Sequence, residues 1–325
     1  MRARAVRIDR TGGPEVLQLV DVDLPPPGPG QVLMRTTAIG LNFIDTYHRS
    51  GLYPVELPAP IGSEAAGVVD SVGAGVSDLA PGDRVATFGP LRGAYATARI
   101  VPAEALVRLP DDISDETAAA VMLKGCTTEF LVERCGRVES GWPVLVHAAA
   151  GGVGLLLVQW LKAIGATVIG TTGTEAKADL ARAAGADHVL LAGEPDLAAR
   201  VRALTGGEGV RVTFDGVGKA TFAISLDSTA KRGLVISFGN ASGAVGDVDF
   251  AILARKGSLF ATRPTLFDYY VTQEERAAGA ARLFEMLRSG AVKVTIGQRY
   301  ALDDVRRAHE DLEARRTTGS TLLLP

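Results

Sequence analysis

Apolar residues in the middle of the chain form short runs that alternate with longer segments of helical periodicity. Residues 144–148 form an apolar strand-like run, and 154–164 carry apolar residues at helical spacing. The pattern continues with strands expected at 167–171, 188–191, 211–215 and 234–239, and helices at 175–184, 196–204 and 220–230. This alternation predicts a doubly wound parallel sheet with helices on both faces.

The two ends of the chain follow another pattern. Short runs with Gly/Pro turns predict strands at 5–9, 16–22, 31–39, 65–72 and 84–88, and Ser114 is the expected N-cap of a helix that starts at Asp115. The tail predicts helices at 274–289 and 302–315 and strands at 292–296 and 321–324. We therefore expect a barrel-like β domain that resumes after an inserted domain.

Composition excludes several classes of protein. The 325 residues are 47% hydrophobic and 22% charged, so the chain is not mainly disordered. A net charge of -3 provides no basic field, and nucleic acid is not expected as the main partner. Cys126 and Cys135 are too few for a disulfide framework or a four-cysteine zinc site.

One uncharged stretch, between Glu139 and Lys162, is about long enough to cross a bilayer. Its proline and central glycines favour a buried strand, a turn and a helix instead, so we expect no membrane association. The first residues have no apolar signal region, and we expect a cytoplasmic protein.

The strongest local motif is the turn His147-Ala-Ala-Ala-Gly-Gly-Val-Gly154 between a predicted strand and a predicted helix. A dinucleotide pyrophosphate needs a tight turn and a backbone without Cβ atoms at a helix N-terminus. Ala149 takes the first glycine position of the usual motif, while Gly151 and Gly154 fill the others. The alternative is a glycine-rich turn that binds nothing.

The end of the second expected strand of this domain indicates the type of nucleotide. It reads Gly170-Thr-Thr-Gly-Thr174, with no carboxylate before Glu175 and with Lys177 one turn into the helix. An acid here would bind a ribose 2′-hydroxyl, whereas hydroxyls and a lysine suit a 2′-phosphate. NADPH is therefore the expected cofactor, unless Lys177 is simply a solvated side chain.

Several motifs along the whole chain resemble the quinone oxidoreductase (zeta-crystallin-like) branch of the medium-chain dehydrogenases/reductases. They are residues 12–17 (GGPEVL), 42–47 (NFIDTY), 50–54 (SGLYP), 62–67 (GSEAAG), 81–85 (PGDRV), 237–240 (SFGN) and 262–264 (TRP), together with the phosphate turn. The resemblance implies a GroES-like β-barrel domain over 1–124 and 265–325 and a Rossmann NADP-binding domain over 125–264. It also implies a cleft between the domains and a homodimer.

Zinc-dependent relatives of this family differ at two places. They carry Cys-x-x-Asp where this chain has Asn42-Phe43-Ile44-Asp45, and Gly-His-Glu where it has Gly62-Ser63-Glu64. Catalytic zinc needs about three Cys, His or carboxylate ligands, so we expect no metal. His48, His147, His188 and His309 are scattered, and we expect structural roles for them.

The resemblance assigns residues to the cofactor and to catalysis. Asn42, Tyr47 and Tyr53 are the candidate catalytic residues, although positioning alone could supply much of the rate. Asp45 is a cofactor candidate that could instead cap the helix after Asn42. The expected cofactor-binding residues are Phe43, Ile44, Asp45, Thr46, Tyr47, Thr127, Gly151, Gly152, Val153, Gly154, Gly173, Thr174, Lys177, Gly216, Val217, Phe238, Gly239, Asn240, Arg263, Pro264, Thr265 and Arg315. Ala192 stands where the family often has a tyrosine near the adenosine phosphate, so the preference for NADPH is expected to be weaker unless Lys177 and Arg315 suffice.

These observations predict zinc-independent reduction of quinones by hydride transfer from NADPH. An electron-poor quinone needs little polarisation, whereas an alcohol gives up hydride readily only when a Lewis acid helps ionise it. Two alternatives remain open. One is NADPH-dependent reduction of α,β-unsaturated carbonyl compounds, and the other is a non-catalytic NADPH- or RNA-binding protein of the crystallin type.

Overall fold

The structure is a computed structural model that describes all residues 1–325. Contacts divide the chain into two compact units. The first unit contains Met1–Cys126, Tyr270–Phe284 and Val294–Pro325, and the second contains Thr127–Tyr269 and Glu285–Lys293. Both ends of the chain therefore belong to the same unit.

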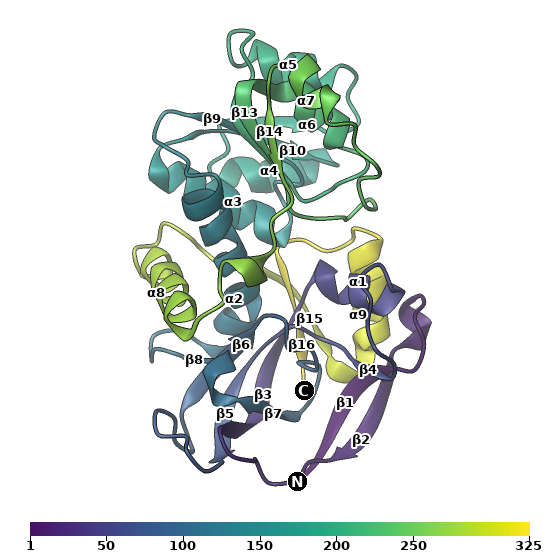
Figure 1. The fold of residues 1–325 in the computed structure, drawn as a ribbon, viewed down its shortest axis with the longest axis vertical. Helices are drawn as coiled ribbons and strands as arrows, with labels where there is room; N and C mark the ends of the chain where they lie inside the picture. Colours follow the sequence, from purple (N-terminus) through teal and green to yellow (C-terminus); the bar gives the residue numbers. More distant parts are fainter. The chain divides into compact units, whose positions relative to one another are not determined.

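The first unit is built mainly from short β-strands (Figure 1). Its strands are β1 (Arg2–Ile8), β2 (Gln18–Asp23), β3 (Gln31–Leu41), β4 (Ala59–Pro60), β5 (Glu64–Val72), β6 (Arg84–Phe88), β7 (Ala98–Pro102), β8 (Leu106–Arg108), β15 (Ile296–Ala301) and β16 (Ser320–Leu324). A seven-stranded sheet has the order β15-β16-β3-β5-β6-β8, with β7 paired to β3, and a smaller sheet has the order β2-β1-β4. Because β16 pairs with β3, the end of the chain completes a sheet that the N-terminal region begins.

Helices α1 (Phe43–Ser50) and α9 (Val305–Glu313) lie side by side in this unit (Figure 1). Helices α2 (Asp115–Glu129) and α8 (Gln273–Arg288) contain points where the chain passes from one unit to the other. The Thr117 amide donates to Ser114 Oγ over 3.1 Å, which confirms Ser114 as the cap of α2.

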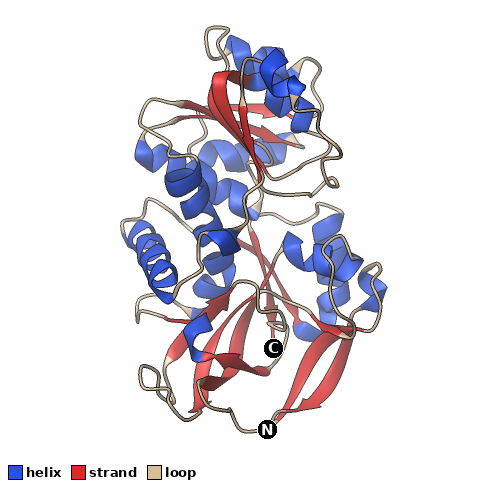
Figure 2. Ribbon diagram, in the orientation of Figure 1, coloured by secondary structure: helices blue, strands red, loops and turns tan.

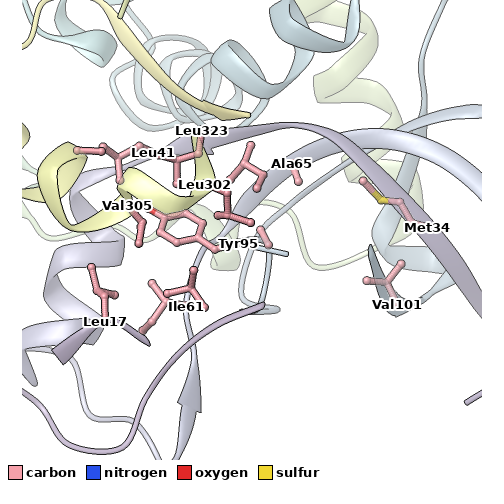
Figure 3. Packing of buried hydrophobic residues seen from close by; sticks show 14 of the residues in the cluster. Leu17, Met34, Leu41, Ile61, Ala65, Tyr95, Val101, Leu302, Val305 and Leu323 are labelled. Atoms are coloured by element: carbon pink, nitrogen blue, oxygen red, sulfur yellow. The ribbon is translucent and has the colours of Figure 1, made fainter. Parts of the chain in front are cut away.

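A single apolar core joins the N-terminal strands of the first unit to its C-terminal elements. Figure 3 shows Leu41 of β3 and Leu323 of β16 close to Leu302 and Val305, with the Tyr95 ring among them. These side chains are buried, and the tail is therefore part of the core of this unit.

The second unit contains the predicted parallel sheet. Its strands are β9 (Pro143–Val146), β10 (Thr167–Thr172), β11 (His188–Leu191), β12 (Val210–Asp215), β13 (Thr229–Ser237) and β14 (Phe260–Thr262), in the order β11-β10-β9-β12-β13-β14. Helices α3 (Gly152–Ile164), α4 (Glu175–Ala183), α5 (Leu197–Ala203), α6 (Phe222–Ser228) and α7 (Ala251–Arg255) surround it (Figure 2). All five strand pairs are parallel, so the expected doubly wound sheet is confirmed.

The structure corrects several elements expected in the sequence. Residues 292–295 are not a strand, because the Val292 amide donates to Met286 O and turns the chain back on α8. Residues 229 and 230 belong to β13 rather than to a helix, and the Thr229 hydroxyl lies 2.8 Å from that of Thr213. The expected helix 302–315 is a 3₁₀ turn followed by the shorter α9.

Two segments of the tail, 265–269 and 285–293, belong to the second unit, although the sequence places 265–325 entirely in the first. The side chain of Gln159 on α3 pairs with the backbone of Lys293 through two hydrogen bonds of 3.1 and 2.8 Å. This pairing holds residues 285–293 against the sheet's own helix layer. The uncharged stretch before Lys162 folds as β9 and most of α3, and no helix is both long and apolar enough to span a membrane.

Candidate active site

Most of the expected cofactor residues of the second unit lie along one edge of its sheet. Gly151–Gly154 follow β9, Gly173 follows β10, Gly216 follows β12, Phe238 follows β13 and Arg263 follows β14. The strands are parallel, so their carboxyl ends share this edge. The strand order reverses between β9 and β12, and in open α/β sheets ligands bind outside such a reversal.

The phosphate turn places a helix N-terminus at that reversal. Helix α3 begins at Gly152, and the amides of its first turn have no acceptor within the helix. A Cβ atom on Gly154 would lie 2.2 Å from Ala148 O, so only glycine fits where the helix begins beside the turn. The arrangement leaves amides and the positive end of the helix dipole available to an anion.

The end of β10 provides the group expected at the adenosine ribose. Thr174 caps α4 by accepting the Lys177 amide over 3.3 Å, and it places Lys177 in the first turn of the helix. Glu175, the first carboxylate after β10, pairs with Arg182 at 2.7 Å. Arg182 also pairs with Asp179 at 2.7 Å, so the charge of Glu175 is compensated only in part.

Two neighbouring strand ends are in close contact. A Cβ atom on Gly239 would lie 2.2 Å from Gly216 O. Asp215 is fully buried at the end of β12 and accepts the amides of Val217 and Gly218 at 2.9 and 3.0 Å. The carboxylate therefore fixes the turn that carries Gly216 and Val217.

Arg263 joins the ends of β14 and β13. Its Nη1 donates to Ser237 O over 2.9 Å, and its Nη2 contacts the Asn240 side-chain oxygen at 3.0 Å when that amide is oriented to satisfy both partners. Pro264 and Thr265 follow directly, and Thr265 precedes a 3₁₀ turn. Arg263–Thr265 therefore lie next to Phe238–Asn240, as expected.

The expected catalytic residues lie in the first unit, around the start of α1. The Asn42 side chain donates to Glu64 Oε2 over 2.9 Å. Glu64 is completely buried, and it also accepts the Leu123 amide at 2.6 Å and the Lys124 ammonium at 3.2 Å. Asn42 is thus oriented by a buried ion pair between β5 and α2.

Asp45 lies next to this pair and is also completely buried. It accepts hydrogen bonds from the Asn42 amide at 2.9 Å, from Ser63 Oγ at 2.8 Å and from the Tyr95 hydroxyl at 2.9 Å. Burial raises the pKa of this carboxyl to about 6, while its hydrogen bonds and Lys124 oppose the rise. Its bond to the Asn42 amide caps α1, which is the alternative role that the sequence allows.

Three aromatic side chains gather along α1 and the turn after it. The Tyr47 and Tyr53 rings meet edge to face with centroids 5.2 Å apart, and Phe43 lies 6.4 Å from Tyr47. Tyr47 is buried, whereas Phe43, Ile44 and Tyr53 are half-buried. Thr46 is buried, and its hydroxyl donates to Phe43 O within the helix.

The remaining expected residues are Thr127 and Arg315. Thr127 lies on α2 and is half-buried, and Arg315 follows α9 in the first unit with a left-handed φ of 59°. Ser63, Glu64, Lys124 and Tyr95 belong to the buried clusters but were not expected as site residues. The available signal was a lysine directly after the apolar run 118–123 in the middle of α2, because a lysine buried there requires a partner.

The chain matches two families that together define its class. Residues 28–111 match the alcohol dehydrogenase GroES-like domain, and residues 152–286 match the zinc-binding dehydrogenase family. These matches, with the parallel sheet, confirm the expected fold of a GroES-like domain and a Rossmann-type domain. The class is that of the medium-chain dehydrogenases/reductases.

Relatives that match over their full length show which family within this class the chain belongs to. A quinone oxidoreductase from Pseudomonas aeruginosa is 50% identical over 99% of this chain and all of its own length. The crystal structure of an Escherichia coli quinone oxidoreductase complexed with NADPH has a TM-score of 0.97 and 46% identity, with 99% of this chain and 100% of that chain covered. A 2-haloacrylate reductase from a Burkholderia species is 42% identical over 99% of this chain and 98% of its own length. The chain belongs to the quinone oxidoreductase family, and it is an oxidoreductase.

The name of one matched family implies zinc, but the residues around Asn42 do not suit it. Asn42 and Ser63 offer an amide and a hydroxyl, and the Glu64 carboxylate already holds the Lys124 ammonium. No group of three or more His, Cys, Asp or Glu side chains that could hold a metal ion occurs in the chain. A divalent ion at Glu64 would be repelled by Lys124 and would lack nitrogen or sulfur ligands.

Proposed function

We propose that this protein reduces quinones with NADPH and without zinc. The observation that carries the proposal is the full-length match to quinone oxidoreductases, together with an uncharged donor set at Asn42 and Ser63. A quinone accepts hydride because the product ring is aromatic, so no Lewis acid is required. The reaction adds a hydride and one proton to the quinone and yields the hydroquinone.

The cofactor is NADPH, as the sequence predicts and as the solved E. coli relative supports. NADPH supplies the hydride when it is bound. The α3 N-terminus at Gly151–Gly154 would hold the pyrophosphate, and Gly173, Thr174 and Lys177 would hold the adenosine ribose and its 2′-phosphate. The positive end of α4 and the Lys177 side chain in its first turn favour an anion there.

For the other half of the cofactor, we propose the strand ends at Gly216–Val217 and Phe238–Asn240 and the segment Arg263–Thr265. The contacts between Gly216 and Gly239 and between Arg263 and Ser237 O support this grouping. We also retain Thr127, Phe43–Tyr47 and Arg315 as cofactor contacts, on the family resemblance. Asp45 would act through Asn42 and Ser63, because its own carboxylate is buried.

We propose Asn42, Tyr47 and Tyr53 as the residues that act on the acceptor. Asn42 is held in one orientation by Glu64, which suits an amide that positions a carbonyl oxygen. Tyr47 and Tyr53 meet edge to face, so a planar quinone would stack on the face of one ring only, and we propose the half-buried Tyr53 for this contact. A tyrosine hydroxyl would donate a hydrogen bond to the oxygen that becomes negative.

The test is a comparison of acceptors with the purified protein. NADPH oxidation is followed with 1,4-benzoquinone, with a 2-haloacrylate and with an enal, before and after dialysis against a chelator. The proposal expects the quinone to have the highest kcat/KM and expects dialysis to leave it unchanged. Turnover that depends on added Zn²⁺, or no turnover of any quinone, would contradict it.

The second candidate function is reduction of the carbon–carbon double bond of an α,β-unsaturated carbonyl compound. It is favoured by the 42% identity to the 2-haloacrylate reductase. A higher kcat/KM for the haloacrylate or the enal in the same comparison would select it.

Assembly and location complete the proposal. We propose a homodimer and a cytoplasmic location, both on the resemblance to the bacterial quinone oxidoreductases. Light scattering of the eluted protein would show about twice the mass of one chain. A monomer at micromolar concentration would contradict the dimer.

A further inference from the structure

A continuous line of polar side chains crosses the apolar core of the first unit. Arg49 Nη1 lies 3.1 Å from His309 Nδ1, His309 Nε2 lies 3.2 Å from the Tyr95 hydroxyl, and that hydroxyl donates to Asp45 over 2.9 Å. Arg49, Tyr95 and His309 are at most 2% exposed. The line begins at Arg49 on α1, passes through His309 on α9 and then Tyr95, and ends at Asp45 in the first turn of α1.

The chemistry of the groups fixes the direction of every hydrogen bond in this line. A guanidinium only donates, so His309 Nδ1 must accept from Arg49 and the ring hydrogen must lie on Nε2. His309 Nε2 therefore donates to the Tyr95 oxygen, and the Tyr95 hydroxyl donates to Asp45. Glu313 fixes the far end by accepting two hydrogen bonds from Arg49, at 3.0 and 2.6 Å.

We propose that Tyr95 and His309 are positioning residues, a proposal that rests on the function proposed above. They hold Asp45 ionised, as the acceptor of the Asn42 amide. Ionised Asp45 accepts from the Asn42 amide and from Ser63 at the same time. It thereby fixes the first turn of α1, which carries Asn42 and leads to Tyr47. Protonation would weaken these bonds, because a neutral carboxyl is a poorer acceptor than a carboxylate and one of its oxygens then carries a hydrogen, and it would loosen that turn.

The apolar surroundings of the line show why the negative charge of Asp45 needs hydrogen-bond donors. Tyr95 lies among Ile61, Leu302 and Val305 in the apolar core (Figure 3), and a Cβ atom on Gly62 would lie 2.2 Å from its ring. The charged groups near Asp45 are Lys124 on α2 and Glu64 on β5, and Arg49 and Glu313 stand at the far end of the line. Burial raises the pKa of Asp45 to about 6 even with three donors in place.

The line orients Asp45 but does not conduct protons to it. A proton passing through His309 would have to arrive at Nδ1, and the guanidinium of Arg49 occupies that position. Arginine does not release a proton in the working pH range. Burial and Arg49 lower the pKa of His309 to about 3, which agrees with a neutral ring that holds a single tautomer.

The first experiment compares pH profiles of kcat/KM for benzoquinone. Tyr95→Phe removes one donor to Asp45, and we expect the acid limb of the profile to move up by about one pH unit. The matched control is Tyr300→Phe, which removes a tyrosine hydroxyl that donates to Asp311 over 2.6 Å at the outer side of α9. The control should leave the limb in place. An unshifted limb in Tyr95→Phe would overturn the proposal.

His309 allows a conservative rescue. His309→Leu should shift the acid limb in the same direction as Tyr95→Phe, because the Tyr95 hydroxyl loses the donor that orients it. His309→Gln offers an oxygen to Arg49 and an amide hydrogen to Tyr95, and it should bring the limb back toward that of the wild type. Equal profiles for the two His309 variants would contradict the assigned direction of the bonds.

A second measurement does not depend on activity, so it separates this proposal from the proposed function. Tyr95→Phe disfavours ionised Asp45, so its urea midpoint should fall further below wild type at pH 8 than at pH 5. Tyr300→Phe should lose about the same at both values. If no quinone is reduced but this difference is found, only the proposed function fails. If quinones are reduced and Tyr95→Phe behaves as the control does, only the positioning role fails.

Discussion

The two regions that carry the candidate site residues are built by different means. At the sheet edge of the second unit, backbone provides the site: amides at the start of α3 and glycines at the ends of β9, β10 and β12. Around Asn42 in the first unit, side chains provide it, through Asp45, Glu64 and Lys124. The first kind of site is sensitive to added atoms where the backbone is closely packed, as at Gly154, and the second is sensitive to a lost charge.

A large effect is expected where the start of α3 lies close to the backbone of the phosphate turn. Gly154→Ala would place a Cβ atom 2.2 Å from Ala148 O and 2.8 Å from Ala149 C, and backbone atoms cannot move aside easily. We expect NADPH affinity to fall more than ~100-fold, equivalent to roughly 2.7 kcal/mol or more, in a fluorescence titration. Gly193→Ala, whose Cβ would meet nothing within 4 Å, is the control in the same unit. Similar affinities for the two variants would refute the close-approach argument.

Removal of one charge tests the side-chain site. Lys124→Met leaves the buried Glu64 without its cation, and we expect the free energy of unfolding to fall by about 3–5 kcal/mol. Urea unfolding measures this loss. Glu64→Gln combined with Lys124→Met should recover part of it, because no unpaired charge then remains. A double variant less stable than Lys124→Met alone would show that the ion pair is not the reason.

The pH dependence of stability gives a smaller effect with a definite sign. The pKa of Asp45 is raised from 3.8 to about 6, so the folded state binds this proton more tightly, and its stabilising contribution is lost as the pH rises from about 4 to 6. His48 and His309 act oppositely, because burial lowers their pKa values to about 4 and about 3. Asp45 therefore offsets part of the acid sensitivity that the buried histidines cause.

Asp45→Asn removes this offset. Between pH 6 and pH 4 its unfolding free energy should fall more steeply on acidification than that of the wild type, by up to about 1.4 kcal/mol per pH unit. Urea unfolding at several pH values measures both slopes. Parallel slopes would mean that Asp45 does not titrate in this range.

The same difference between the two units explains how much of the fold and of the candidate site can be predicted from the sequence. Most of the second unit's strands and helices, although not α7 and β14, follow from local periodicity, and the turn at the start of α3 follows from one continuous motif. The polar line of the first unit joins residues 45, 49, 95, 309 and 313, whose separations leave no local pattern. His309 was expected to be only structural, and nothing near it in the sequence indicates Tyr95 as its neighbour.

The helices and strands that the sequence predicts wrongly, or does not predict, also depend on contacts between distant residues. The apolar residue Val292 fits a strand pattern, yet it lies in the turn after α8, where its side chain is buried and its amide donates to Met286 O. Strands β7, β8 and β14 have five, three and three residues, and they exist through pairing with β3, β6 and β13 rather than through their own pattern. Tertiary pairing therefore decides what local propensity leaves open.

The smallest effect concerns the preference for NADPH at the sheet edge. Ala192 is exposed, and its amide donates to Thr172 O at the end of β10, near the expected 2′-phosphate site. Ala192→Tyr would add a hydroxyl that can donate to this phosphate, and we expect the NADPH-over-NADH ratio of kcat/KM to rise about 2–10-fold. Ala199→Tyr, at an exposed position on α5, controls for the added ring. If the two variants change the ratio equally, the ring and not the hydroxyl is responsible, and Lys177 alone accounts for the preference on this side of the site.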